Sequence, residues 1–307
     1  MNLARPPVGV SQHPRAAFTY QTRLKLVGFL FVLPALAFFL VFFLYPVGQA
    51  VWVSFTTWNL FSPPVFVGLQ NYLQIFTDPL FLNSLRVTVT FGFLTTAILC
   101  LVSLGLALLV ERSLRFIELF QTLYFLPSVL PLAVVAILWG YMLDNLGFVN
   151  DLLRSLFHVG LPFLTSSDVA LYSIVFTQVW AAAGYFMVLF KAGLQAIPTT
   201  FYDAAKIDGA GGLQIIWHVT LPLLRPTLFF VITLLLINTF QQFDLFYLMT
   251  SGGPGNSTQA VTFKIYLDAF FNLRMGWATA ESMVLFVIML VMTLIQARVF
   301  RTDFTYE

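Results

Sequence analysis

Long apolar runs without a charged residue constrain this chain more than any other feature of its sequence. Between Lys25 and Asp78 no Asp, Glu, Lys or Arg occurs, and Leu26 to about Val53 is an almost unbroken apolar stretch. A helix that crosses the hydrocarbon core of a bilayer needs about 20 mostly apolar residues. In lipid, a helix also lets an isolated segment satisfy its own backbone hydrogen bonds. The first run therefore predicts a membrane-spanning helix.

Five further runs of the same kind follow along the chain. They lie between Arg86 and Glu111, between Glu118 and Asp144, between Asp168 and Lys191, from Pro226 to about Thr250, and from Met275 to Ala297. Barrel strands are excluded because the runs are too long and do not alternate. Only 9% of the 307 residues are charged, against roughly 25% in a soluble domain. We predict an all-α, polytopic membrane protein with six transmembrane helices.

Lysine and arginine are distributed unevenly among the segments that connect these runs. Most of the 15 fall in the two tails and in the second and fourth loops. Because cytoplasmic loops are enriched in these residues, both termini are predicted to be cytoplasmic. Residues 1–25 then form an N-terminal tail, residues 26–298 the transmembrane domain and residues 299–307 a C-terminal tail.

The fourth loop, about residues 197–226, has the composition of two short helices. Pro198 is expected to end the fourth span, and Thr199 or Thr200 to cap a new helix. Asp203 is predicted in the first turn of that helix, where the positive helix end favours an acid.

A glycine-rich bend follows, at Gly209, Gly211 and Gly212, and a second short helix is predicted to run to Leu221-Pro222. Glycine at position 209 adopts positive φ at little cost and permits close approach of another surface. Two short helices with small residues at the bend suit docking against another protein. A linker hairpin with well-chosen caps fits the same residues equally well.

Polar residues inside the spans form the second informative feature. The stretch Asn238-Thr-Phe-Gln-Gln-Phe-Asp244 lies in span five, and such groups are costly in lipid unless they find partners or face water. On a helix, Asn238 and Gln242 share a face with Thr239 beside them. They either line a polar path or bond to neighbouring helices as packing contacts. Glu281, about two turns into span six, is expected to reach the outer interface or a polar cavity.

The fourth loop resembles the Glu-Ala-Ala loop of the inner-membrane permeases of binding-protein-dependent ABC importers. It reads Tyr202-Asp-Ala-Ala-Lys-Ile-Asp-Gly-Ala210 and then Val219-Thr-Leu-Pro-Leu-Leu-Arg-Pro226, with Asp203 in place of the usual Glu. The resemblance covers about residues 25–298. Further stretches are similar to the carbohydrate branch, the maltose and glycerol-phosphate type permeases: Phe66-Val-Gly-Leu-Gln-Asn-Tyr72, Phe125-Leu-Pro-Ser128, Gly193-Leu-Gln-Ala-Ile-Pro198 and Leu248-Met-Thr-Ser-Gly-Gly-Pro-Gly255.

This resemblance implies the type I importer permease fold and the role of a translocation subunit in a sugar importer. Its partners would be a second homologous permease, two ATP-binding cassette subunits and an extracytoplasmic sugar-binding protein, in the cytoplasmic (inner) membrane of a bacterium or archaeon. A coupling helix in the fourth loop would dock on the ATPase. The coupling residues implied are Asp203, Ala204, Ala205, Asp208, Gly209, Leu221 and Pro222.

The same resemblance implies a set of sugar contacts on spans four and five. These are Ala181, Ala182, Tyr185, Asn238, Thr239 and Gln242. The hypothesis is that Tyr185 stacks on the sugar while Asn238 and Gln242 bond its hydroxyl groups.

The chain is not expected to be an enzyme. The glycines of Thr250-Ser-Gly-Gly-Pro-Gly-Asn-Ser-Thr258 lack the Gly-Lys-Ser/Thr of a phosphate loop, so ATP would be bound by a partner. No cofactor, metal site or nucleic-acid partner is expected. The alternative function is an ion-coupled secondary transporter. Such a transporter is expected to have two related halves, broken helices and charged residues in mid-membrane. A membrane anchor without transport is a third possibility, and it leaves the polar cluster in span five unexplained.

Overall fold

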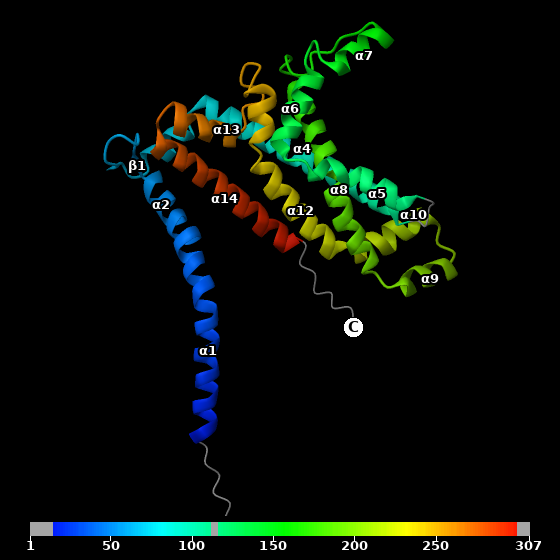
Figure 1. The fold of residues 1–307 in the computed structure, drawn as a ribbon, viewed down its shortest axis with the longest axis horizontal. Helices are drawn as coiled ribbons and strands as arrows, with labels where there is room; N and C mark the ends of the chain where they lie inside the picture. Colours follow the sequence, from blue (N-terminus) through cyan, green and yellow to red (C-terminus); the bar gives the residue numbers. More distant parts are fainter. Residues whose placement is uncertain (1–14, 112–115, 300–307) are drawn as a thin grey trace, which may run out of the picture. The chain divides into compact units, whose positions relative to one another are not determined.

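The computed structural model describes residues 15–111 and 116–299, and these residues are helical almost throughout (Figure 1). By length and composition, five helical segments are able to cross a membrane, and a bent pair makes a sixth. The five are Thr22–Ser54, Pro79–Val110, Leu132–Phe157, Ala170–Gln195 and Met275–Val299, and the pair is Gly212–Leu223 with Arg225–Phe240, bent by 73°. The prediction of an all-α membrane protein with six spans is confirmed.

The chain divides into two compact units, and the first ends at Trp52. Its described part is a continuous helical rod: α1 (Arg15–Phe39), a π-helical turn (Leu40–Leu44) and the start of α2 (Tyr45–Ser54). The helix begins at Arg15, so the predicted tail of residues 1–25 is helical over its last residues. Residues 1–14 and the predicted C-terminal tail from residue 300 onward lie outside the described residues.

The second unit opens with a two-residue antiparallel ladder, a small exception to the all-α prediction. In it Thr56 pairs with Phe66 and Thr57 with Val65. The elements up to the second span are β1 (Thr56–Thr57), β2 (Val65–Phe66), α3 (Gln70–Ile75) and α4 (Pro79–Val110). Asp78 caps α4, since its side chain accepts a hydrogen bond from the backbone N–H of Leu80 at 3.0 Å.

The third predicted span, between Glu118 and Asp144, is not one helix. It consists of α5 (Ile117–Phe125), a 3₁₀ turn (Leu126–Val129) and α6 (Leu132–Leu143). Pro127 and Pro131 fall in the interruption, where proline removes the backbone donors that a continuous helix requires.

Helix α7 (Phe148–Phe157) follows this span, with Gly147 at its N-cap. The Asn150 side chain is buried and holds the surrounding loop. Its amide donates to the carbonyl oxygens of Asp144 (2.9 Å) and Leu161 (3.0 Å).

The rest of the second unit contains the fourth, fifth and sixth spans. Its elements are α8 (Ala170–Gln195), α9 (Thr199–Ile207), α10 (Gly212–Ile215), a π turn (Ile216–Thr220), α11 (Leu221–Leu223), α12 (Arg225–Phe240), a π turn (Phe246–Thr250), α13 (Val261–Tyr266), a π turn (Leu267–Phe271) and α14 (Met275–Val299). The fifth predicted span, Pro226 to Thr250, therefore breaks after Phe240. Helices α9 and α10 lie at the end of this unit opposite to β1 and α13 (Figure 1).

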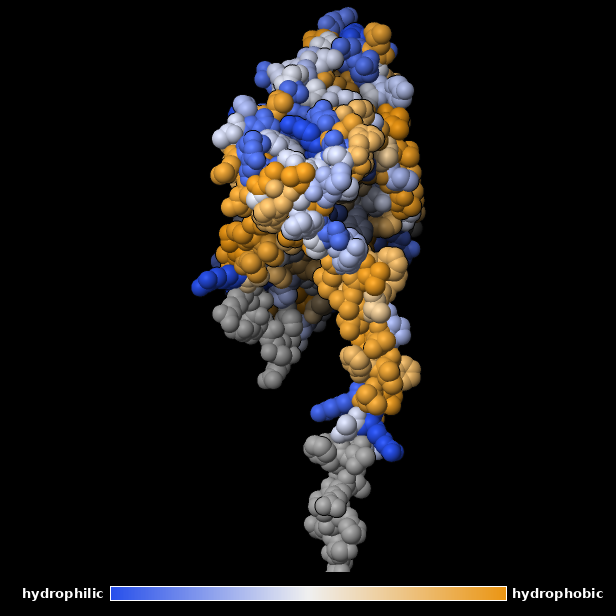
Figure 2. Space-filling view, turned by 90° about the vertical axis from the view of Figure 1, so that its left-hand side faces the viewer, coloured by the Kyte–Doolittle hydropathy of each residue, from blue (hydrophilic) through white to orange (hydrophobic). Residues whose placement is uncertain are grey.

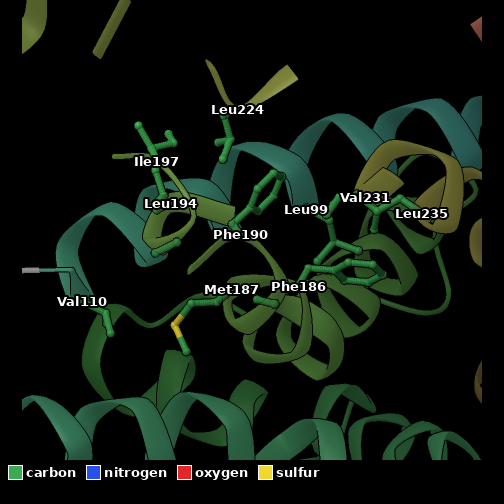
Figure 3. Close-up of a cluster of buried hydrophobic side chains, with 12 residues drawn as sticks. Leu99, Val110, Phe186, Met187, Phe190, Leu194, Ile197, Leu224, Val231 and Leu235 are labelled. Atoms are coloured by element: carbon green, nitrogen blue, oxygen red, sulfur yellow. The ribbon is translucent and has the colours of Figure 1, made fainter. Parts of the chain in front are cut away.

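The core of the second unit forms where α4 packs against both α8 and α12. Figure 3 shows Phe186, Phe190 and Leu194 of α8 beside Leu99 of α4 and Leu235 of α12, and all five are buried. The α8 residues recur at a spacing of four, which places them on one face. In Figure 2 the helical rod of the first unit is hydrophobic along most of its length, and its apolar side chains are exposed. This rod thus has the apolar surface that a bilayer requires.

Candidate functional site: a cavity at two helix breaks

A cavity of about 200 Å³ lies between α8, the interruption before α6 and the end of α12. Its lining contains three carboxamide side chains from two helical spans, and we call it the amide cavity. The lining residues are Pro127, Ser128, Leu130, Leu132, Gln178, Ala181, Ala182, Tyr185, Phe186, Asn238 and Gln242. Five of the six predicted sugar contacts are therefore brought together in one place.

Both interruptions in the helical backbone border this cavity. Pro127 lies in the 3₁₀ turn that separates α5 from α6, and Gln242 lies in the non-helical stretch after α12. Non-helical backbone at membrane depth is tolerated where it lines a cavity or is buried in protein. The Gln242 carbonyl oxygen accepts a hydrogen bond of 2.5 Å from the Thr262 hydroxyl, so the break is held from outside its own helix.

Helix α8 presents one face to the cavity. Gln178, Ala181, Ala182 and Tyr185 follow the spacing i, i+3, i+4 and i+7, which places them on one side of a helix. The alanines leave space beside the Tyr185 ring, whose side chain is 45% exposed.

Gly184 has a different role, which is to let α5 approach α8. A Cβ atom at this position would lie 2.0 Å from the carbonyl oxygen of Tyr124. Glycine is therefore required for the contact that brings the end of α5, and with it Pro127 and Ser128, to the cavity. Ala183 is turned into the core, where its carbonyl oxygen accepts a 3.1 Å hydrogen bond from Ser103 of α4.

The polar groups of the amide cavity keep unused hydrogen-bonding capacity. The Asn238 amide donates to the Leu234 carbonyl oxygen at 2.8 Å, which occupies one of its two N–H donors. The Gln178 side-chain oxygen is buried and has no partner among the described residues. Buried polar atoms in native proteins are nearly always bonded, and an exception calls for an explanation such as a ligand or ordered water.

Gln242 has a structural role as well as a place in the lining. In the amide orientation that satisfies both of its groups, its oxygen accepts from the backbone N–H groups of Asp244 (3.3 Å) and Leu245 (3.0 Å). It thereby caps the helical segment that resumes after the break. The prediction that Asn238 and Gln242 share a helical face is wrong, because α12 ends at Phe240. The break nevertheless leaves both side chains in the lining.

Thr239 is the predicted sugar contact that the structure does not bring to the cavity. Its buried hydroxyl donates to the Leu235 carbonyl oxygen at 2.8 Å, and it lies 3.3 Å from the hydroxyl of Thr96 on α4. This arrangement matches the packing alternative for the polar cluster. Gln178 and Ser128 are lining residues that the sequence analysis missed. Gln178 is a polar residue in mid-span one turn before Ala182, and that was the available signal.

The second predicted functional region, the fourth loop, forms a sharply defined bend. Helix α9 ends in a Schellman motif: the Ala210 N–H donates to the Ala205 carbonyl oxygen (2.9 Å) and the Gly209 N–H to that of Lys206 (3.1 Å). Gly209 has φ of +77°, as the sequence predicted. Asp208 is the C-cap residue of this helix.

Two details of the predicted α9 are wrong. Pro198 occupies the N-cap, with Thr199 as the first helical residue, so neither threonine caps the helix. Asp203 lies beyond the first turn and forms an exposed ion pair of 3.4 Å with Lys206.

The remaining predicted coupling residues are distributed along this end of the unit. Ala204 is exposed and Ala205 half-buried on α9, while Leu221 and Pro222 are half-buried in α11. Three large apolar side chains that the sequence analysis did not select project from the same region. Ile207, Leu213 and Trp217 are 85%, 74% and 63% exposed.

At the opposite end, Lys264 lies within ion-pair distance of three carboxylates. Its Nζ is 3.1 Å from Asp78, 2.6 Å from Asp268 and 3.0 Å from Glu281. Lys264, Asp268 and Glu281 are buried. We call Lys264, Asp78, Asp268, Glu281 and Arg274 together the Lys264 network. The expectation that Glu281 reaches an interface or a cavity is wrong, since its side chain has no exposed surface.

Arg274 closes the network on its more exposed side. Its guanidinium donates to the Asp268 carboxylate and lies 4.8 Å from the centre of the Trp277 ring. Burial opposes the charge of Lys264, but the carboxylates of Glu281 and Asp268 raise the Lys264 pKa above its usual value. Burial likewise opposes the charge of Asp268, but hydrogen bonds from Lys264 and Arg274 lower its pKa. Lys264 and Asp268 are therefore both charged at neutral pH.

Comparisons with known proteins bear on what such a chain does. Residues 115–302 match the family described as "Binding-protein-dependent transport system inner membrane component". The probable ABC transporter permease protein YurN of Bacillus subtilis (strain 168) is 33% identical over 287 residues, covering 91% of this chain and 97% of that protein. The sn-glycerol-3-phosphate transport system permease protein UgpA of Yersinia pestis is 36% identical over 284 residues, covering 91% and 95%.

The fold has a counterpart among solved structures. A chain in the crystal structure of a bacterial ABC transporter involved in the import of the acidic polysaccharide alginate superposes with a TM-score of 0.82. The two chains are 22% identical, and the match covers 94% of this chain and 100% of that one. The type I importer permease fold that the sequence implied is therefore confirmed.

Proposed function

Since the chain belongs to the family of inner-membrane components of binding-protein-dependent transport systems, we propose that it is a translocation subunit of an ATP-driven sugar importer. It would form the membrane path with a second permease, above two ATPase subunits that bind the ATP. An extracytoplasmic binding protein would deliver the sugar. The observation that carries this proposal is the amide cavity, because it places polar, partly unpaired side chains at two helix breaks within membrane-spanning segments. An ion-coupled transporter does not fit this family.

The proposed orientation places both termini and the bend at Gly209 in the cytoplasm. The lysine and arginine bias supports it. The arrangement of the second unit agrees, because α9 and α10 lie at the end opposite to β1 and α13 (Figure 1). The Lys264 network would then face the outer side.

Coupling to the ATPase would run through α9 and the bend that follows it. Exposed apolar side chains that cluster on a surface often mark a protein interface, and Ile207, Leu213 and Trp217 flank the positive-φ glycine. Asp203 and Asp208 would supply polar contacts at the rim. A short helix seated in a cleft of the ATPase would transmit its closure as a rigid-body movement.

One pair of variants tests this coupling surface. Ile207→Asp places a charge on a side chain that is 85% exposed, so we expect the chain to fold while the ATPase subunits no longer co-purify with it. Leu146→Asp is the matched control, because Leu146 is 83% exposed in the loop between α6 and α7. Retention of the ATPase by Ile207→Asp, or its loss in the Leu146 control, would refute this assignment.

The sugar would lie against Tyr185, with Asn238, Gln242 and Gln178 bonding its hydroxyl groups. Ala181 and Ala182 would form the adjoining wall. Concave sites of this kind combine an apolar or aromatic surface with a few polar groups that fix orientation. Thr239 would support the site from behind through its bond to α4 and not touch the sugar.

Transport by the reconstituted complex tests the site. Tyr185→Ala and Gln242→Leu should each lower sugar uptake at least about tenfold, equivalent to about 1.4 kcal/mol of lost binding, while the subunits still co-purify. Tyr172→Ala and Gln241→Leu are the controls, since both residues are exposed and lie outside the cavity lining. Normal uptake by both cavity variants would move the site elsewhere.

A further inference from the structure

We infer that the solute carried through this cavity is an uncharged sugar or polyol, and not an anionic solute such as a sugar phosphate or an acidic saccharide. This inference rests on the proposed function and specifies the substrate class of the same site. The inferred solute differs in charge from the solutes named for two similar proteins. One is a relative named for sn-glycerol 3-phosphate, and the other, similar in fold, is a transporter of the acidic polysaccharide alginate.

The polar groups that line the amide cavity are all neutral donors and acceptors. They are the carboxamides of Gln178, Asn238 and Gln242 and the hydroxyls of Ser128 and Tyr185. A carboxamide offers both N–H donors and an acceptor oxygen, and a hydroxyl offers one donor and two acceptor positions. A sugar hydroxyl has the same dual character, so each of these groups has a suitable partner on a neutral sugar.

The lining has both donors and acceptors: Asn238 keeps one unused N–H donor, whereas Gln178 and Ser128 accept. The Gln178 oxygen is buried without a partner among the described residues, and the Ser128 hydroxyl already donates to the Phe125 carbonyl oxygen at 2.6 Å. Both therefore offer lone pairs to a ligand. A phosphate or carboxylate brings only acceptors at neutral pH, whereas a hydroxyl brings a donor.

The charges nearest to the cavity along its own elements disfavour an anion. Asp244 follows Gln242 by two residues, and its backbone N–H is bonded to the Gln242 side chain. The next cation on α8 is Lys191, six residues from Tyr185 or about 9 Å along the helix axis. The Lys191 ammonium also interacts electrostatically with the Glu111 carboxylate, where it opposes the rise in the Glu111 pKa that burial causes.

The first cation of α12 is farther away still. Arg225 precedes Asn238 by 13 residues, or about 20 Å along the axis. An ionised group inside a membrane protein is costly unless it is paired. A solute with hydroxyl groups alone satisfies the amide cavity without that requirement.

The test uses the complete complex of both permeases, the ATPase subunits and the binding protein in liposomes. Neutral mono-, di- and oligosaccharides and polyols are compared with sn-glycerol 3-phosphate and alginate oligosaccharides for uptake and for stimulation of ATP hydrolysis. We expect stimulation by at least one neutral compound and by neither anion. Stimulation by an anion overturns this inference and leaves the proposed function standing, whereas no stimulation by any compound overturns both.

Two variants that place opposite charges at position 238 test whether the solute is charged, independently of the comparison between compounds. For a neutral solute, Asn238→Lys and Asn238→Asp should each reduce uptake by about tenfold or more and by similar factors. For an anionic solute the two variants would separate, with uptake kept or raised by lysine and abolished by aspartate. Asn145→Lys and Asn145→Asp, at an exposed asparagine outside the cavity, control for the added charge itself. A tenfold or larger separation between the two Asn238 variants would overturn the inference.

Discussion

The amide cavity and the Lys264 network are two ways of placing polar groups in a chain that is otherwise suited to lipid. In the network, ions of opposite sign lie 2.6 to 3.1 Å apart and use each other as partners. In the cavity, neutral groups border open space, and the Gln178 oxygen has no partner among the described residues. One oxygen of Glu281 also lacks a hydrogen-bond partner among the described residues, so an unbonded polar atom alone does not mark a binding site. The difference teaches that neutral groups bordering a cavity, and not ions paired with one another, are the groups available to an uncharged solute.

The largest expected effect comes from breaking the network. Lys264→Met leaves three carboxylates facing an apolar side chain, and removing one partner of a buried ion pair costs about 3–5 kcal/mol. Equilibrium unfolding in mixed detergent micelles measures the change. Lys206→Met is the control, because the exposed pair of Lys206 with Asp203 is worth about 0–1 kcal/mol.

A double variant sharpens this prediction. If the loss in Lys264→Met comes from unpaired acid, Lys264→Met combined with Glu281→Met should be less destabilising than the sum of the single changes. A coupling of about 0.5–3 kcal/mol is typical of residues in one network. Strict additivity would show that the pair does not act as a unit.

A smaller effect is expected where a wall of the cavity is moved without changing its polar groups. Gly184→Ala forces a methyl group against the Tyr124 carbonyl oxygen, and overpacking of this kind costs about 1–3 kcal/mol. Both stability and sugar uptake should fall. Uptake is affected because the contact between α5 and α8 brings Pro127 and Ser128 to the cavity. Gly105→Ala on α4 has open space around its added methyl group and should not destabilise the protein. Equal stability of the two variants would contradict the proposed close packing of α5 on α8.

The smallest effect on stability should come from the cavity itself. Gln178→Leu removes a buried oxygen that has no partner in the described chain, so unfolding free energy should stay the same or rise by up to about 1 kcal/mol. Sugar uptake should nevertheless fall, because a hydrogen bond to the solute is lost. A clear loss of stability would mean that Gln178 belongs to the packing, as Thr239 does.

The sequence predicted most of the spans because their boundaries are set by composition. Apolar length and the positions of charged residues are local properties, and so is the positive φ of Gly209. The break before α6 was also readable from Pro127 and Pro131. The break after Phe240 was not, because Gln241-Gln242-Phe243 contains neither glycine nor proline. Its backbone is held by Thr262, a residue about twenty positions away.

The functional groups also divide into those set by local sequence and those set by residues far apart in the chain. Gln178 and Tyr185 lie two turns apart on one helix, and their common face could be predicted from helical spacing alone. The Lys264 network could not, because Asp78, Lys264 and Glu281 come from three separate elements and only Lys264 and Asp268 are close in sequence. For Thr239 the sequence allowed both sugar binding and packing, and only its neighbours on α4 distinguish them.

The double role of Gln242 has a consequence for how this transporter can diversify. Its side chain both borders the cavity and caps the helical segment that begins at Asp244. Within residues 15–111 and 116–299, Gln178 and Asn238 make no such bond to a neighbouring segment of backbone. After gene duplication, substitutions at those two positions can change what is carried while the backbone stays intact. We expect paralogues with new substrates to vary at 178 and 238 first and to retain an amide or another capping side chain at 242.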